Sequence, residues 1–108
     1  MSNYAVDRQR WAKFTLQEQM GNIGSEVGRS IKAWRAGDKP RFEGALIRAL
    51  DLFDATTEQL IAAKSPRAKE VLRAQDQYLA VFFDDHADDA DKIENYFMQY
   101  ALAARRLK

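Results

Sequence analysis

Acidic residues are the most concentrated chemistry-bearing side chains in this sequence. Positions 84–91 hold five aspartates and the only histidine. Carboxylate oxygens at this density are typical ligands of hard cations, and Asp84, Asp85 and Asp88 are the weak candidates here. An EF-hand loop also needs a central glycine and a bidentate glutamate, and neither is present. We therefore expect no metal at this turn, and we expect Asp88 or Asp89 to cap the helix that follows.

Two carboxylate pairs, Asp51-x-x-Asp54 and Asp88-x-x-Asp91, suggest a second kind of metal chemistry. All-helical hydrolases of the nucleotide-pyrophosphohydrolase type hold Mg²⁺ with carboxylates at this spacing. The glutamate-rich half of their ligand set is missing here. The absence of cysteine excludes thiol nucleophiles and cysteine-ligated metals. A metal-dependent hydrolase is therefore an alternative interpretation, and no cofactor is expected.

A basic cluster surrounds the first predicted turn between helices. Its members are Arg29, Lys32, Arg35, Lys39 and Arg41. Such a cluster could grip a phosphate backbone with support from a neighbouring tryptophan, although helical spacing turns that ring inward. The whole chain of 108 residues has a net charge of only +1, which indicates no polyanionic partner. Nucleic-acid binding by an accessory protein is thus a second alternative.

Three glycines lie at helical spacing in segment 21–28. Each glycine inside a helix costs about 1 kcal/mol relative to alanine, so the set costs about 3 kcal/mol. At about 100° per residue, Gly21, Gly24 and Gly28 share a sector of about 60° beside the apolar stripe. This flank predicts close approach of a helix of the same chain, of a second chain, or of a ligand. A phosphate loop is excluded because no Lys-Ser/Thr pair follows the glycines.

The last predicted helix carries two apolar residues on its outer side. Met98 and Leu102 are spaced i, i+4 and lie roughly opposite the inward-facing Ile93 and Phe97. Apolar residues on an outer helix face are typical of a partner-helix contact, and isolated ones are also ordinary on surfaces. Met98 and Leu102 therefore join the three glycines as candidate interface residues.

The elements that position these residues are helices. Pro40 and Pro66 suit first helical turns, and Thr15 and Glu18 have capping-box spacing. No strand-like alternation of useful length occurs. The apolar periodicity predicts helices over about 16–36, 40–63, 66–83 and 89–107.

An N-terminal arm or short helix within 1–14 should lie across these helices, pinned by Trp11 and Phe14. Because the turns are short, consecutive helices should be antiparallel neighbours. We therefore expect an all-α, up-down-up-down antiparallel four-helix bundle that forms a single domain over residues 1–108. Ile47, Leu52 and Ile61 should widen the buried face of the second helix on both sides.

Two polar residues should lie at or near the core. Glu26 falls near its boundary and can pair with Arg29 at i, i+3. Gln75 falls near the centre of the apolar face of the third helix, so its amide needs hydrogen-bond partners. A tyrosine hydroxyl could supply one of them.

Targeting signals are not found in the sequence. The first residues have no apolar h-region, and no apolar run approaches the roughly 18–20 residues that a membrane helix needs. Together with the lack of cysteine, this makes the cytoplasm the expected location.

Two segments carry a resemblance to a group of small prokaryotic all-helical proteins with no assigned activity. They are Gly21-Asn22-Ile23-Gly24-Ser25-Glu26-Val27-Gly28-Arg29 and Tyr100-Ala101-Leu102-Ala103-Ala104-Arg105-Arg106. More loosely, the size and predicted topology are similar to HEPN and nucleotidyltransferase-partner bundles, which dimerise. The HEPN ribonuclease motif places an arginine four to six residues before a histidine. It is absent before His86, so that resemblance implies a non-catalytic role.

The sequence therefore predicts a non-enzymatic protein–protein interaction module. Contact would be made through the glycine flank or through the outer face of the last helix. The expected partner is a second copy, giving a homodimer, or a separate protein. The hydrolase and the nucleic-acid accessory protein are the alternatives.

Overall fold

This computed structural model describes residues 5–106 of the chain. This range contains five α-helices and one short 3-10 helix. They are α1 (Arg8–Trp11), α2 (Leu16–Arg35), α3 (Lys39–Ala62), α4 (Arg67–Phe83), the 3-10 turn (Ala87–Asp89) and α5 (Ala90–Arg106). No strand occurs within this range, so the all-α prediction is confirmed. None of these helices has the length and apolar character that crossing a membrane requires.

The helix ends follow local sequence signals. Thr15 Oγ1 accepts a hydrogen bond from Glu18 N at 3.1 Å, and Glu18 Oε1 accepts one from Thr15 N at 2.9 Å. This is the predicted capping box at the start of α2. Just beyond α2, Gly37 adopts φ +71°, a left-handed conformation that favours glycine. Asp38 then caps α3 by accepting a hydrogen bond from Arg41 N.

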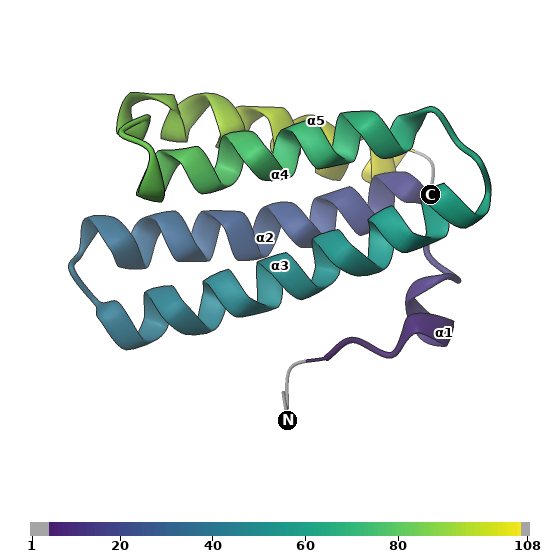
Figure 1. Ribbon diagram of the computed structural model, residues 1–108, viewed down its shortest axis with the longest axis horizontal. Helices are drawn as coiled ribbons and strands as arrows, with labels where there is room; N and C mark the ends of the chain where they lie inside the picture. Colours follow the sequence, from purple (N-terminus) through teal and green to yellow (C-terminus); the bar gives the residue numbers. More distant parts are fainter. Residues whose placement is uncertain (1–4, 107–108) are drawn as a thin grey trace.

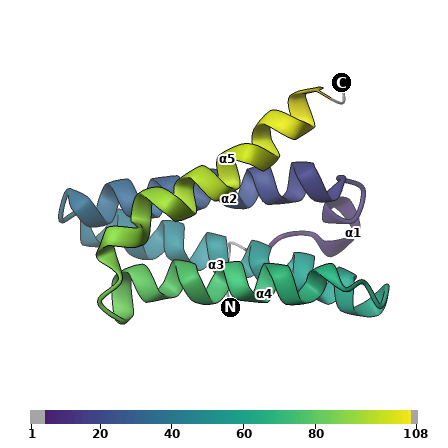
Figure 2. The ribbon, with the colours of Figure 1, turned by 90° about the horizontal axis from the view of Figure 1, so that it is seen from above.

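Helix α2 contacts both α3 and α5, and these are the two most extensive helix contacts in the described chain. Helix α4 packs against α3 and, less extensively, against α5. Figure 1 shows α4 and α5 on the same side of the layer formed by α2 and α3. Seen from above, α5 crosses α2 obliquely and its last turns diverge from α4 (Figure 2). Helix α2 is therefore the element on which α3 and α5 are assembled.

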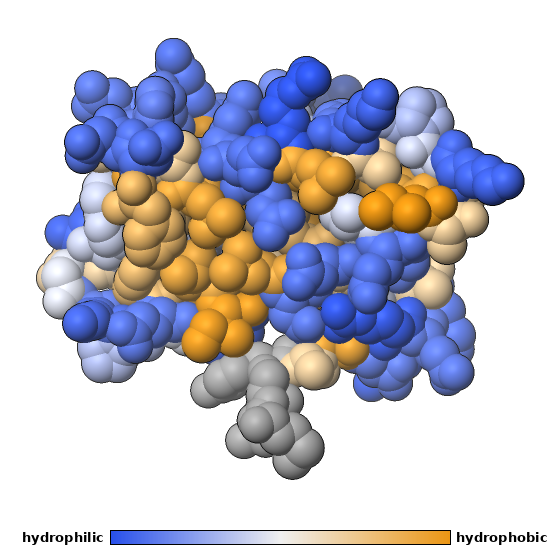
Figure 3. Space-filling view, in the orientation of Figure 1, coloured by the Kyte–Doolittle hydropathy of each residue, from blue (hydrophilic) through white to orange (hydrophobic). Residues whose placement is uncertain are grey.

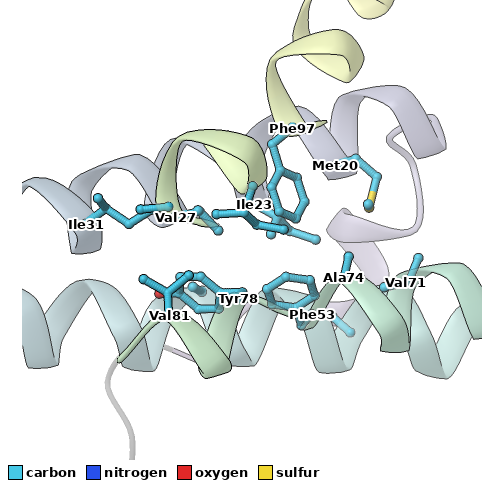
Figure 4. Close-up of a cluster of buried hydrophobic side chains, with 14 of the residues drawn as sticks. Met20, Ile23, Val27, Ile31, Phe53, Val71, Ala74, Tyr78, Val81 and Phe97 are labelled. Carbon is cyan, nitrogen blue, oxygen red and sulfur yellow. The ribbon is translucent and has the colours of Figure 1, made fainter. Parts of the chain in front are cut away.

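The apolar stripe of α2 supplies one side of a single core. Its members Met20, Ile23, Val27 and Ile31 are all 0 % exposed. Figure 4 shows this stripe facing buried side chains of α3 and α4, among them Phe53, Ala74 and Tyr78, with Phe97 reaching in from α5. Burying these side chains is the main stabilising contribution to the fold.

A buried hydrogen bond at Tyr78 connects α4 to α2 within the core. The Tyr78 hydroxyl lies 2.7 Å from Ser30 Oγ, and both residues are 0 % exposed. Burial raises the pKa of Tyr78 to about 12. The hydroxyl therefore stays protonated and can hydrogen-bond across α2 and α4.

The expectation for Ile47 and Ile61 is wrong. They are 47 % and 59 % exposed instead of widening the buried face of α3. The buried sector of α3 runs through Ala45, Ala49 and Phe53. Ile47 is two residues from each of these alanines, so it lies about 200° around the helix from them.

The N-terminal arm is held by a buried polar cluster. Trp11 is 4 % exposed, and its Nε1 donates a hydrogen bond to Thr56 Oγ1 at 2.9 Å. Thr56 Oγ1 donates in turn to Gln19 Oε1 at 3.1 Å, and Gln19 Nε2 donates to Trp11 O at 2.9 Å. Phe14 contributes less than expected, because it remains 43 % exposed. The arm is thus anchored through Trp11 and its partners on α2 and α3.

Two adjacent buried threonines test this anchor. Thr56→Val removes the acceptor of Trp11 and the donor to Gln19. We expect the free energy of unfolding to fall by about 2–4 kcal/mol, because two buried polar groups are left unpaired. Urea denaturation measures the change.

Thr57→Val is the matched control. Thr57 is 8 % exposed, and its hydroxyl has no hydrogen-bond partner in the described structure. Loss of this hydroxyl should leave the free energy of unfolding unchanged or raise it by up to about 1 kcal/mol. Equal losses for the two variants would contradict the anchoring role of Thr56.

Candidate anion-binding cleft and interface groove

Helix α5 covers two of the three glycines in α2. A Cβ atom at Gly24 would lie 2.6 Å from Phe97 Cβ, and one at Gly21 would lie 3.4 Å from Ala101 Cα. A Cβ atom at Gly28 would meet nothing within 4 Å in the described structure. A helix of the same chain therefore accounts for Gly21 and Gly24, whereas Gly28 keeps open space beside it.

The open space at Gly28 belongs to a groove between α2 and α5, with a volume of about 470 Å³. We call it the α2/α5 groove; its lining includes Gly21, Gly24, Gly28, Met98, Arg29, Lys32 and Glu94. Met98 is 57 % exposed. Leu102 is 46 % exposed and lies one helical turn further along α5, outside the lining. The groove thus brings together candidate residues from the two predicted interfaces.

The basic cluster divides between two sides of α2. A second hollow, the α2/α3 cleft, has a volume of about 620 Å³ and is lined by Arg29, Lys32 and Arg41 of the predicted cluster. Lys39 is not in this lining. Arg35 is not either, because it pairs with Asp91 at 3.1 Å and Glu94 at 3.8 Å. Arg29 and Lys32 line both the cleft and the groove.

Arg48 is a member of the cleft that sequence reasoning missed. It lies on α3, and its Nε donates to Glu26 Oε2 at 2.6 Å. The other oxygen of Glu26 accepts from Arg29, which is the predicted i, i+3 pair. The Glu26 side chain is only 9 % exposed. One buried carboxylate therefore holds two arginines at the same cleft.

Within the acidic turn, Asp89 lies close to two basic side chains. Asp89 lies 3.3 Å from His86 Nδ1 and 3.6 Å from Lys92 Nζ. Elsewhere, Asp51 accepts hydrogen bonds from Val6 N at 2.6 Å and from Arg8 at 2.9 Å, and so holds the arm. Between residues 5 and 106, no three histidine or carboxylate side chains are grouped so that they could hold a metal ion. The weak candidates Asp84, Asp85 and Asp88 form no such group.

A polar cluster joins α4 to α5 around Glu70. Glu70 Oε1 accepts hydrogen bonds from Tyr100 at 2.6 Å and from Tyr96 at 2.9 Å, and Oε2 accepts one from Arg67 at 3.2 Å. The bond from Tyr100 is the main cause that lowers the pKa of Glu70. Burial raises the pKa of both tyrosines. Gln75, which the sequence placed near the centre of the apolar face of α4, is half-buried and is not a member of this cluster.

A further apolar surface lies over α3 and α4. Figure 3 shows hydrophobic residues gathered in the middle of the face on which these two helices lie. The large exposed hydrophobic side chains of α3 and α4 are Ile47, Ile61, Leu72 and Phe83. Sequence reasoning missed this face, because apolar periodicity assigned all four of these residues to the buried faces of their helices.

Comparison of the chain with protein-family models, with curated proteins and with solved structures gave no match. The resemblances to small prokaryotic helical proteins and to HEPN bundles therefore remain predictions from the sequence.

The different surroundings of Gly24 and Gly28 give a direct test of the α2–α5 contact. Gly24→Ala should lower the free energy of unfolding by about 1–2 kcal/mol, because Phe97 Cβ must move away from the new methyl group. The methyl group of Gly28→Ala meets no such contact, so this variant should raise the free energy of unfolding by up to about 1 kcal/mol. Thermal and urea unfolding at low protein concentration compare the two. A stabilised Gly24→Ala variant would contradict the close approach of α5.

The Glu70 cluster makes stability depend on pH. A lowered carboxylate pKa stabilises the folded state above the pKa of the unfolded chain, and this contribution is lost as pH falls through the folded pKa. Glu70→Gln should therefore be less stable than the parent at neutral pH. The difference should shrink as the solution is acidified below pH 4.5, the ordinary value for this group. Urea midpoints across the acid range measure it, and a difference independent of pH would contradict the assignment.

Proposed function

We propose that the protein is a non-enzymatic interaction module that self-associates through the α2/α5 groove. The scaffold is an up-down-up-down antiparallel four-helix bundle formed by α2, α3, α4 and α5. The observation that supports the proposal is that Gly28 and Met98 line the same groove. Gly28 has open space beside it, and Met98 is exposed.

Shape favours a second copy as the occupant. Two copies related by a two-fold axis present the same surface to each other, so that surface must be self-complementary. The groove has a recess at Gly28 and a protruding, flexible apolar side chain at Met98. Met98 of each copy can fill the recess at Gly28 of the other. This contact also gives a reason for the glycine at position 28. A glycine inside a helix lowers stability relative to alanine, and no close contact within residues 5–106 requires one there.

Charge supports the same arrangement. On the α2 wall the groove carries Arg29 and Lys32, whereas the α5 wall carries Glu94 and, three helical turns further along, Arg105. A two-fold axis that runs along the groove sets the α2 wall of one copy against the α5 wall of the other. Lys32 then faces a carboxylate, and opposite charges across an interface favour correct register. Leu102, one turn from Met98, extends the apolar contact along α5.

The solution mass tests self-association. At high micromolar concentration, light scattering should give twice the chain mass of 12.4 kDa. Gly28→Leu fills the recess without a clash inside the chain, and Met98→Lys places a charge in the apolar contact. Both variants should shift the mass to that of one chain while keeping helical circular dichroism.

Ile47→Lys is the matched control, because Ile47 is similarly exposed and lies on α3. It should leave the dimer intact. A single-chain mass for the parent protein would contradict self-association. A dimer broken only by Ile47→Lys would move the interface to the α3 and α4 face. Gly24→Leu is less informative, because its side chain would meet Phe97 of the same chain.

A further inference from the structure

The α2/α3 cleft combines a charged rim with an apolar floor. The cations at the rim are Arg29, Lys32, Arg41 and Arg48. The floor includes Ala33 and Ala45, which are 7 % and 1 % exposed, with Ala36 and Pro40 beside them. Its volume of about 620 Å³ falls within the range of small-molecule sites, about 300–1,000 Å³. We propose that this cleft binds a small phosphorylated molecule, with its phosphoryl oxygens at the rim and its uncharged part on the alanines.

The local charge favours an anion. Four cations border the cleft, whereas Asp38 is the only carboxylate among the described residues that line it, and Glu26 pairs with Arg29 and Arg48 beside it. Lys32 has no ion-pair partner within residues 5–106, and Arg41 is held only by Asp38 at 3.4 Å. The cleft therefore has positive charge in excess, although the whole chain is nearly neutral. Guanidinium groups suit phosphoryl oxygens because they donate planar pairs of hydrogen bonds.

Glu26 prepares the cleft for such a ligand. Its two carboxylate oxygens fix Arg29 and Arg48, which come from different helices. A side chain that is already ordered loses less conformational entropy when a ligand binds. Arg29 uses one nitrogen in this pair and keeps the rest of its five N–H donors for other acceptors. Gly44 adds room, since a Cβ atom there would lie 3.4 Å from the Arg48 guanidinium.

A small ligand fits better than a nucleic-acid strand. Proteins that bind single strands stack bases on aromatic side chains along a basic track. None of the described residues that line the cleft is aromatic. Arg35, which would extend the basic track along α2, is engaged by Asp91 and Glu94. The remaining cations border one open cleft and suit a compact anion.

Calorimetric titration of the full chain with inorganic phosphate, pyrophosphate and ATP tests the proposal. Affinity should rise from phosphate to pyrophosphate to ATP, and pyrophosphate should compete with ATP. Arg41→Ala should weaken ATP binding about tenfold, as expected for the loss of a charged hydrogen bond. Ala36→Leu keeps every charge but fills the cleft, and it should weaken ATP and leave phosphate little changed. Both residues lie outside the α2/α5 groove, so neither substitution alters the proposed dimer contact.

Arg73→Ala is the matched control, because it removes the same charge from an exposed site on α4. It should bind ATP as the parent does. Equal weakening by Arg41→Ala and Arg73→Ala would overturn the proposal in favour of nonspecific attraction. So would the absence of binding at millimolar ATP, or an unchanged affinity in Ala36→Leu. A short RNA that binds more tightly than ATP and loses affinity with Arg41→Ala would replace the small ligand with a nucleic acid.

Discussion

The contact between Gly24 of α2 and Phe97 of α5 determines where α5 lies. Because Gly24 has no side chain, the Phe97 ring passes close to the α2 backbone and reaches Phe53, with 5.8 Å between the ring centroids. Adjacent residues on a helix point about 100° apart. Fixing Phe97 in the core therefore turns Met98 towards the α2/α5 groove and Tyr96 towards Glu70 of α4. One close approach positions both the groove and the polar cluster.

Glu26 has a comparable role on the other side of α2. A carboxylate that is 9 % exposed is costly unless it is paired and hydrogen-bonded. Glu26 meets this requirement with arginines from two helices, and its position therefore specifies how α3 lies along α2. The same pairing orders the α2/α3 cleft. The Glu26 ion pairs thus both constrain the packing of α3 on α2 and shape the candidate binding site.

The sequence was most informative where the signal is local. The capping box at Thr15, the stop at Gly37 and the apolar stripe of α2 all depend on residues within a few positions of one another. The glycine spacing identified a flank that is approached closely. It could not identify the occupant, because Phe97, which packs on Gly24, lies more than 70 residues further along the chain. Arg48 was missed for a similar reason, since its pairing with Glu26 requires α2 and α3 to be docked. Similarly, the exposure of Ile47 depends on which sectors of α3 the neighbouring helices cover, and this too is set only when the helices are docked.

Arg29 and Lys32 form a ridge of α2 that lies between the cleft and the groove. A ligand in the cleft would draw these cations towards α3, and a second copy in the groove would draw them towards α5. The two binding events would therefore share the same charges and oppose each other. Such coupling is reciprocal, so a ligand that loosens the dimer is itself bound less tightly by the dimer. In thermodynamic terms, this ridge would make the concentration of a small anion a regulator of assembly.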